Sequence, residues 1–180
     1  MSRTVRLHDL EFAETLSPEQ VAERVRGLAA ALRRRFPDVG GPPLFLAVLR
    51  GAAVFHADLI RAYEGLLAVG YLRTRSYVGT ESSGGVEVDI PDDLPLAGRD
   101  VVLVEDIADT GRTLRVLAQA LRDRGVASLT TVVLLDKPSA RVVEAAVDYV
   151  GFTIGPAFVV GYGLDYDDLG RNLPGIYTRV

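Results

Sequence analysis

Three short segments rich in apolar residues constrain this chain most: LFLAVL at 44–49, VVLV at 101–104 and SLTTVVLLD at 128–136. A strand with one face in water alternates apolar and polar residues, whereas these segments are typical of strands buried on both faces. The segment after VVLV has helical spacing, since one apolar stripe is formed by Leu114, Leu117, Ala118 and Leu121. Strands that alternate with helices predict an α/β fold with a doubly wound, mostly parallel sheet flanked by helices.

Other segments complete this pattern. Residues 17–36 are predicted to form a helix, with Ser17 as the N-cap, Pro18 at the first helical position and Gln20 completing a capping box. A second helix is expected over 52–63. Further strands are expected over 69–78 and 86–90 and, shorter, within 147–154 and 158–163. With 180 residues, of which 48% are hydrophobic, we predict one domain spanning residues 1–180.

Composition narrows the function. The chain has no cysteine, which excludes disulfides, thiolate metal sites and a cysteine nucleophile. Its net charge of −4 disfavours binding along a nucleic-acid backbone, so no nucleic-acid partner is expected. No run of 18 apolar residues and no signal-peptide pattern occur, so we expect a cytoplasmic protein without a membrane partner.

The segment VVLVEDIADTGRTL at 101–114, in which we predict a strand over 101–105 followed by a turn and a helix, holds the main candidate site. Ligands bind parallel α/β sheets beyond the carboxyl ends of the strands, where this segment turns into a helix. A turn of small residues at a helix N-terminus presents backbone N–H groups and the positive end of the helix dipole, which suit a phosphate. Glu105 and Asp106, just before the turn, can accept hydrogen bonds from vicinal hydroxyls. The pattern therefore favours a ribose 5-phosphate site, and the alternative is a solvated acidic turn.

The basic residues are strongly biased. Nineteen are arginine and a single one is lysine, Lys137. Chance is one explanation. The other is a site where a compact ammonium is required and a planar guanidinium does not fit.

Beyond the residues themselves, VVLVEDIADTGRTL resembles the phosphoribosyl-diphosphate-binding signature of type I phosphoribosyltransferases. Four further segments appear in the order and spacing of the bacterial hypoxanthine-guanine phosphoribosyltransferase family: VLRGAAVF at 48–55, RSYVGT at 75–80, LLDKPSAR at 134–141 and FVVGYGLDYDDLGRNLPGIY at 158–177. The resemblance covers nearly the whole chain from about residue 44. It implies the type I phosphoribosyltransferase fold, with a small hood region formed from the termini.

The resemblance also implies an activity. The family transfers the 5-phosphoribosyl group of phosphoribosyl diphosphate to N9 of hypoxanthine or guanine with the help of Mg²⁺, giving IMP or GMP and pyrophosphate. Asp109 would accept the purine N7 proton as the catalytic residue. The residues that would bind phosphoribosyl diphosphate are Glu105, Asp106, Asp109, Thr110, Gly111, Arg112, Thr113, Arg50, Gly51 and Arg171. A cis peptide bond is expected between Leu49 and Arg50.

Residues for the base, the metal and a lid follow from the same resemblance. Lys137 would donate to the purine 6-oxo group, Phe158 would stack on the ring, and Val159 would read the base edge. Asp165 would lie near the base and near a magnesium ion, which Glu105 and Asp106 would also serve. Ser76 and Tyr77 would belong to a loop that closes over the reaction. Family members assemble as dimers or tetramers, so a homo-oligomer is expected.

Two alternatives stay open at this point. A phosphoribosyltransferase-like regulator binds nucleotides without catalysis, but it has no need of Lys137, Phe158 and Asp165. A different base specificity is the second alternative: Lys137 disfavours adenine, whereas xanthine differs from guanine only at the 2-position. A dinucleotide-binding oxidoreductase is disfavoured because no G-x-G-x-x-G sequence occurs.

Overall fold

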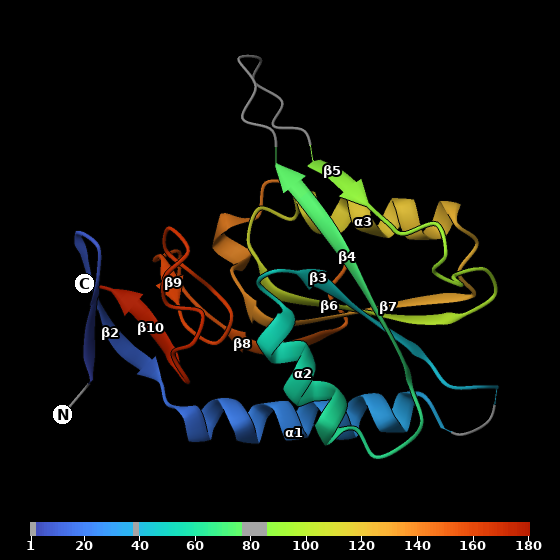
Figure 1. Ribbon diagram of the computed structural model, residues 1–180, viewed down its shortest axis with the longest axis horizontal. Helices are drawn as coiled ribbons and strands as arrows, with labels where there is room; N and C mark the ends of the chain where they lie inside the picture. Colours follow the sequence, from blue (N-terminus) through green and yellow to red (C-terminus); the bar gives the residue numbers. More distant parts are fainter. Residues whose placement is uncertain (1–2, 38–39, 77–85) are drawn as a thin grey trace.

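The computed structural model describes residues 3–37, 40–76 and 86–180. Its larger sheet has the strand order β5-β4-β3-β6-β7-β8, and every neighbouring pair is parallel except β4 and β5 (Figure 1). The predicted doubly wound sheet is confirmed. Its strands are β3 (Leu44–Leu49), β4 (Ala68–Ser76), β5 (Val86–Asp89), β6 (Asp100–Ala108), β7 (Ser128–Asp136) and β8 (Tyr149–Thr153).

Helices cover both faces of this sheet. On one face lie α1 (Pro18–Arg35) and α2 (Ala53–Ala62), and on the other lies α3 (Arg112–Asp123) (Figure 1). Alternate residues of β6 point to opposite faces of the sheet. Val102 packs in the core with α1 and α2, whereas Leu103 packs in the core with α3. The predicted capping box is present: the Ser17 hydroxyl accepts from the Gln20 amide, and the Gln20 side chain accepts from the Ser17 amide.

A second, antiparallel sheet brings the two ends of the described chain together. Its order is β1-β2-β10-β9, with β1 at Thr4–Leu7, β2 at Leu10–Leu16, β9 at Val159–Val160 and β10 at Ile176–Arg179 (Figure 1). Phe12 and Tyr177 are fully buried between its elements. The hood expected from the termini is therefore confirmed, although no strand had been predicted within residues 4–16.

One strand near the site is longer than predicted. β6 was expected to end at Glu105, but it continues to Ala108, because Ile107 and Ala108 still pair with Leu135 and Asp136 of β7. The strand expected over 69–78 is described as far as Ser76, and Tyr77 lies outside the described residues. Within the described residues, the helices are too short or too polar to cross a bilayer.

Candidate active site

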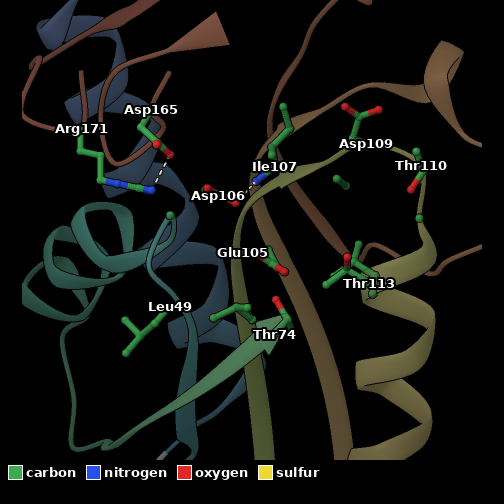
Figure 2. A pocket seen from close by; sticks show the side chains of 15 residues that line it. Leu49, Thr74, Glu105, Asp106, Ile107, Asp109, Thr110, Thr113, Asp165 and Arg171 are labelled. Carbon is green, nitrogen blue, oxygen red and sulfur yellow. Dashed lines mark hydrogen bonds and ion pairs between the residues drawn. The ribbon is translucent and has the colours of Figure 1, made fainter. Parts of the chain in front are cut away.

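A cavity of about 500 Å³ opens at the carboxyl ends of β3, β4 and β6, where the sheet topology predicts a ligand. The hood reaches the same cavity through the connection between β9 and β10. Figure 2 shows the acidic side chains of β6 on one side of the cavity, with Asp165 and Arg171 across from them. The lining residues are Val48, Leu49, Gly51, Thr74, Glu105, Asp106, Ile107, Ala108, Asp109, Thr110, Gly111, Thr113, Leu114, Asp165 and Arg171.

Two adjacent acids, Glu105 and Asp106, stand at the base of the cavity on β6. Glu105 is only 6% exposed. Burial raises the pKa of Glu105 well above its usual range, and the neighbouring Asp106 carboxylate raises it further. Burial also raises the pKa of Asp106, against a hydrogen bond of 2.8 Å that its Oδ1 accepts from the Ile107 amide. Both carboxyl groups line the cavity, where they are well placed to accept hydrogen bonds from hydroxyl groups.

The predicted phosphate loop follows β6 without interruption. Gly111 has a φ of 82° and is the N-cap of α3, which begins at Arg112. The glycine cap has no side chain of its own to accept from the first amides of the helix, although the Thr110 hydroxyl accepts from the Arg112 amide at a long 3.5 Å. An anion bound here would accept from the same amides. Thr110 and Thr113 add two hydroxyl groups to the lining, whereas Arg112 does not line the cavity and is exposed.

The opposite side of the cavity is made by Arg171 and Asp165. They form an ion pair, and Arg171 Nη1 also donates to the Gly163 carbonyl at 2.7 Å. The backbone approaches closely here: a Cβ on Gly51 would overlap the Asp106 carboxylate, and a Cβ on Gly163 would overlap the Gly51 carbonyl. The turn after β3, the acids of β6 and the hood therefore meet at one place.

Arg50 lies at the rim rather than in the cavity lining. The Leu49–Arg50 peptide bond is cis, as expected. Arg50 Nη2 is 3.0 Å from Asp168 Oδ1, and both side chains are largely exposed. The Asp168 amide in turn donates to Asp165 Oδ2 at 2.8 Å, so both arginines are connected to one loop.

Lys137, the one lysine of the chain, is only 4% exposed. Its Nζ lies 3.9 Å from Asp109 Oδ2, and its amide donates to the Ala108 carbonyl at 2.9 Å. Lys137 does not line the cavity itself, but it reaches the cavity edge through Asp109. The ammonium is thus buried beside the carboxylate that is predicted to be catalytic.

The remaining predicted residues belong to the hood and to the end of β4. Phe158 is 44% exposed, and its ring centroid lies 6.2 Å from that of Phe12 and 5.9 Å from that of Tyr166. Val159 is buried in β9. Neither lines the cavity. Ser76 is the last residue of β4 and pairs with Val86, and the predicted lid beyond it is outside the described residues.

The acidic side chains of the cavity suit a magnesium ion if the substrate supplies some of its ligands. Among the described residues, no group of three or more histidine and acidic side chains is arranged to hold a metal alone. Glu105, Asp106 and Asp165 nevertheless line one cavity with hard oxygen atoms. Mg²⁺ commonly keeps several waters and binds through one or two carboxylates plus substrate phosphates, so the residues fit an ion that arrives with its substrate.

Sequence reasoning missed some of the lining. Thr74 presents a hydroxyl at the cavity from β4, and Val48, Ile107 and Leu114 supply apolar surface. The position of Thr74 near the carboxyl end of a predicted strand was the only available signal, because an isolated threonine in a strand is unremarkable in sequence.

Comparisons with known proteins agree with this geometry. The phosphoribosyl transferase domain family model matches residues 14–167. A hypoxanthine-guanine phosphoribosyltransferase of Lactococcus lactis is 44% identical over 88% of this chain and 86% of its own, and one of Bacillus subtilis is 42% identical over 94% and 93%.

Solved structures extend the likeness to three dimensions. A hypoxanthine-guanine phosphoribosyltransferase of Bacillus anthracis has a TM-score of 0.86 at 38% identity, covering 93% of this chain and 98% of its own. The hypoxanthine phosphoribosyltransferase of Trypanosoma cruzi, in complex with the product IMP, has a TM-score of 0.86 at 35% identity, covering 97% and 96%. With a family model that matches residues 14–167 and relatives 44% and 42% identical over most of the chain, this chain belongs to the phosphoribosyltransferase family, and within it to the hypoxanthine-guanine phosphoribosyltransferases.

Proposed function

We propose that this chain is a purine salvage enzyme, which transfers the 5-phosphoribosyl group of phosphoribosyl diphosphate to N9 of hypoxanthine or guanine and releases pyrophosphate. One observation carries the proposal: a glycine-capped helix N-terminus follows two adjacent acids on one strand, the buried Glu105 and the half-buried Asp106, and the buried Lys137 lies next to the loop between them. The start of the helix would bind the phosphate, the two acids the ribose, and the lysine the base.

The sugar phosphate would lie between the end of β6 and the start of α3. The amides at the start of α3 and the hydroxyls of Thr110 and Thr113 would bind the 5-phosphate. Glu105 and Asp106 would accept hydrogen bonds from the ribose hydroxyls. Because the pKa of both acids is raised by burial, hydroxyl donors would also relieve part of their desolvation cost.

Bond cleavage at C1 of the ribose gives an oxocarbenium-like transition state and needs no protein nucleophile. The departing pyrophosphate would be bound by Arg171 and by the turn that contains Arg50 and Gly51. A bound Mg²⁺ would supply positive charge that neutralises the charge developing on the leaving group. Glu105, Asp106 and Asp165 are the acids that would orient it.

The base would lie between the β6 loop and the hood. Asp109 would take the proton from N7 of the purine, and Lys137, held 3.9 Å from it, would donate to the 6-oxo group. Phe158 would stack on the ring, and the Val159 backbone would read the base edge. An adenine amino group would face the ammonium with donor against donor, so the lysine selects 6-oxopurines.

We also propose that residues 1–180 act as one domain and that the protein works in the cytoplasm. The family resemblance supports assembly as a homo-oligomer, a dimer or a tetramer.

Pyrophosphate release from phosphoribosyl diphosphate and Mg²⁺ tests the function, with hypoxanthine, guanine, xanthine and adenine in parallel. We expect turnover with hypoxanthine and guanine and not with adenine. In Lys137→Met, the loss of a buried donor should lower kcat/KM for the 6-oxopurines roughly 10- to 100-fold and blur discrimination against adenine. Lys137→Arg keeps the charge but changes its shape and should recover only part of the activity.

Other outcomes have distinct meanings. Tight binding of phosphoribosyl diphosphate without turnover of any base would replace the enzyme by a nucleotide-binding regulator. Turnover of adenine at the rate of hypoxanthine by the wild-type protein would contradict the role of Lys137. Equal turnover of xanthine and guanine would widen the substrate range without changing the reaction.

A further inference from the structure

The segment that follows β7 folds back onto the phosphate loop. After Lys137 the chain makes a single 3₁₀ turn, Pro138–Ala140, and then runs past the start of α3. Two successive amides of this segment, those of Val142 and Val143, both donate to the Thr110 carbonyl, at 3.0 and 3.2 Å. The phosphate loop is thus held from outside the cavity by a segment that no binding role explains.

These two hydrogen bonds determine which way one amide of the loop points. In a trans peptide the N–H of a residue points opposite to the carbonyl of the residue before it. The Thr110 carbonyl points toward Val142 and Val143, so the N–H of Gly111 points away from them. Gly111 lines the cavity, and its amide is therefore one of the donors available to a phosphate there.

The packing between the two segments is tight. A Cβ on Gly111 would lie 2.5 Å from the Val143 carbonyl oxygen and 2.7 Å from Cδ of Arg141. The stem of Arg141 therefore lies against the loop at its glycine. No larger residue fits this position while the segment stays where it is.

One ion pair holds the segment in place. Arg141 Nη2 pairs with Asp136 Oδ1, and the two side chains are only 18% and 14% exposed. Asp136 is fixed at the end of β7, where it pairs with Ala108 of β6 and directly precedes Lys137. The pair thus closes the turn that starts beside the base-selecting lysine and ends beside the phosphate loop.

We propose that Arg141, held by Asp136, is a positioning residue that presents the Gly111 amide to the 5-phosphate of the bound nucleotide. It touches no substrate. It acts by keeping Val142 and Val143 against the Thr110 carbonyl. The inference rests on the proposed function, because it requires a ribose 5-phosphate in that loop.

The test compares two ligands that differ only in the 5′-phosphate, IMP and inosine. Their dissociation constants are measured by calorimetry for the wild-type protein, Arg141→Met, Arg141→Lys and Arg115→Met. Arg141→Met should weaken IMP about tenfold and leave inosine unchanged, because a single charge-assisted anion contact is misaligned. The loss of IMP affinity in Arg141→Lys, which keeps the charge, should be smaller than in Arg141→Met. Arg115 is exposed one turn into α3, so its variant controls for loss of a nearby positive charge.

A purely structural role would lower the melting temperature and leave the ratio of the two dissociation constants as in the wild type. That result in folded Arg141→Met overturns the proposal, and so does an equal loss in Arg115→Met. If Arg141→Met does not fold, Asp136→Asn decides by the same ratio, since it weakens the ion pair without removing the stem of Arg141. A wild-type protein that binds IMP no better than inosine would instead contradict the proposed function.

Discussion

The two sides of the cavity are built in different ways. One side, which we call the β6–α3 wall, is the continuous segment Glu105–Leu114. The other, the hood wall, consists of Asp165 and Arg171 in the connection between β9 and β10. Strand pairing and a helix start fix the first, whereas ion pairs between side chains and backbone contacts of loops fix the second.

Their charges differ as well. In the β6–α3 wall, Glu105 is buried and Asp106 beside it is half-buried. Burial raises the pKa of both, and the Asp106 carboxylate raises that of Glu105 further. The acid of the hood wall is paired with an arginine, and its neighbour Asp168 is paired with Arg50. The β6–α3 wall therefore carries acids that a bound ligand can stabilise by hydrogen bonds. The hood wall neutralises its own acids with arginines, so its ion pairs can be replaced by contacts to a ligand at a lower cost in free energy.

The largest effect is expected at Asp109 in the β6–α3 wall. Asp109→Asn removes the proposed proton acceptor but keeps its size, so kcat should fall about 10²- to 10⁴-fold with little change in KM for phosphoribosyl diphosphate. Steady-state kinetics measures both. Asp93→Asn, at an exposed position away from the cavity, controls for the change in net charge. A fall of less than about tenfold would place the proton acceptor elsewhere.

A substitution where the walls meet comes next. In Gly51→Ala the new Cβ would overlap the Asp106 carboxylate. The free energy of unfolding should fall by about 1–3 kcal/mol, with weaker binding of phosphoribosyl diphosphate, as measured by urea denaturation and titration. Gly27→Ala is the matched control: nothing lies near its Cβ on α1, so helix propensity should stabilise it by about 0.5–1 kcal/mol. A tolerated Gly51→Ala would show that the walls are not closely fitted.

The buried acids should make stability depend on pH. Because the pKa of Glu105 is raised in the folded protein, the folded state binds the proton more tightly than the unfolded chain does. The stability that protonated Glu105 contributes to the folded protein is therefore fully present below the ordinary glutamate pKa. It is lost as the pH rises toward the raised pKa. In metal-free buffer at pH 8, Glu105→Gln should be more stable than wild type by on the order of 1–2 kcal/mol, and its unfolding free energy should vary less with pH.

The control for that experiment is Glu23→Gln, at an exposed position on α1. We expect it to leave the pH dependence of unfolding as in the wild type. If the unfolding free energies of the wild type and of Glu105→Gln changed equally between pH 5 and pH 8, burial of Glu105 would not affect stability. That result would contradict the raised pKa of Glu105 in the β6–α3 wall.

The smallest effect is expected beside the hood wall. The Arg50–Asp168 pair is about 70% exposed on both sides, so Asp168→Asn should change the unfolding free energy by less than about 0.5 kcal/mol. Asparagine also tolerates the φ of 65° found there. A loss above about 1.5 kcal/mol in urea denaturation would mean that this pair is a structural anchor and that the two walls are equally rigid.

The same contrast explains how much could be predicted from sequence. Strand β6, the turn at Gly111 and α3 were predicted because their signals are local: apolar runs, a glycine turn and a helical stripe. The end of β6 was wrong by three residues, since β7 rather than β6 itself decides how far the ladder continues. The position of Lys137 beside Asp109 was not readable from spacing, although the composition marked the lysine.

The hood shows the opposite case. Strands β1 and β2 pair across a two-residue turn, His8 and Asp9, which lacks the Asn-Gly or Asp-Gly signal of a hairpin. The other neighbour of β2, β10, lies at the far end of the chain, so both strands were missed. Thr74 was missed because its hydroxyl has significance only once β4 is placed beside β3. Asp136 and Arg141 were part of a recognised segment, but their contact with the phosphate loop depends on how that segment folds back.

The pairing of β2 with β10 has a consequence for how the enzyme comes into being. Thr15 and Thr178, which share a hydrogen bond, are 163 positions apart. Closing so long a loop is entropically costly, and contacts of this kind form late. The cavity is lined both by residues of β6 and by Asp165 and Arg171 in the connection that precedes β10. Its hood side therefore takes shape only once β10 is available to pair with β2, even if the large sheet has already formed.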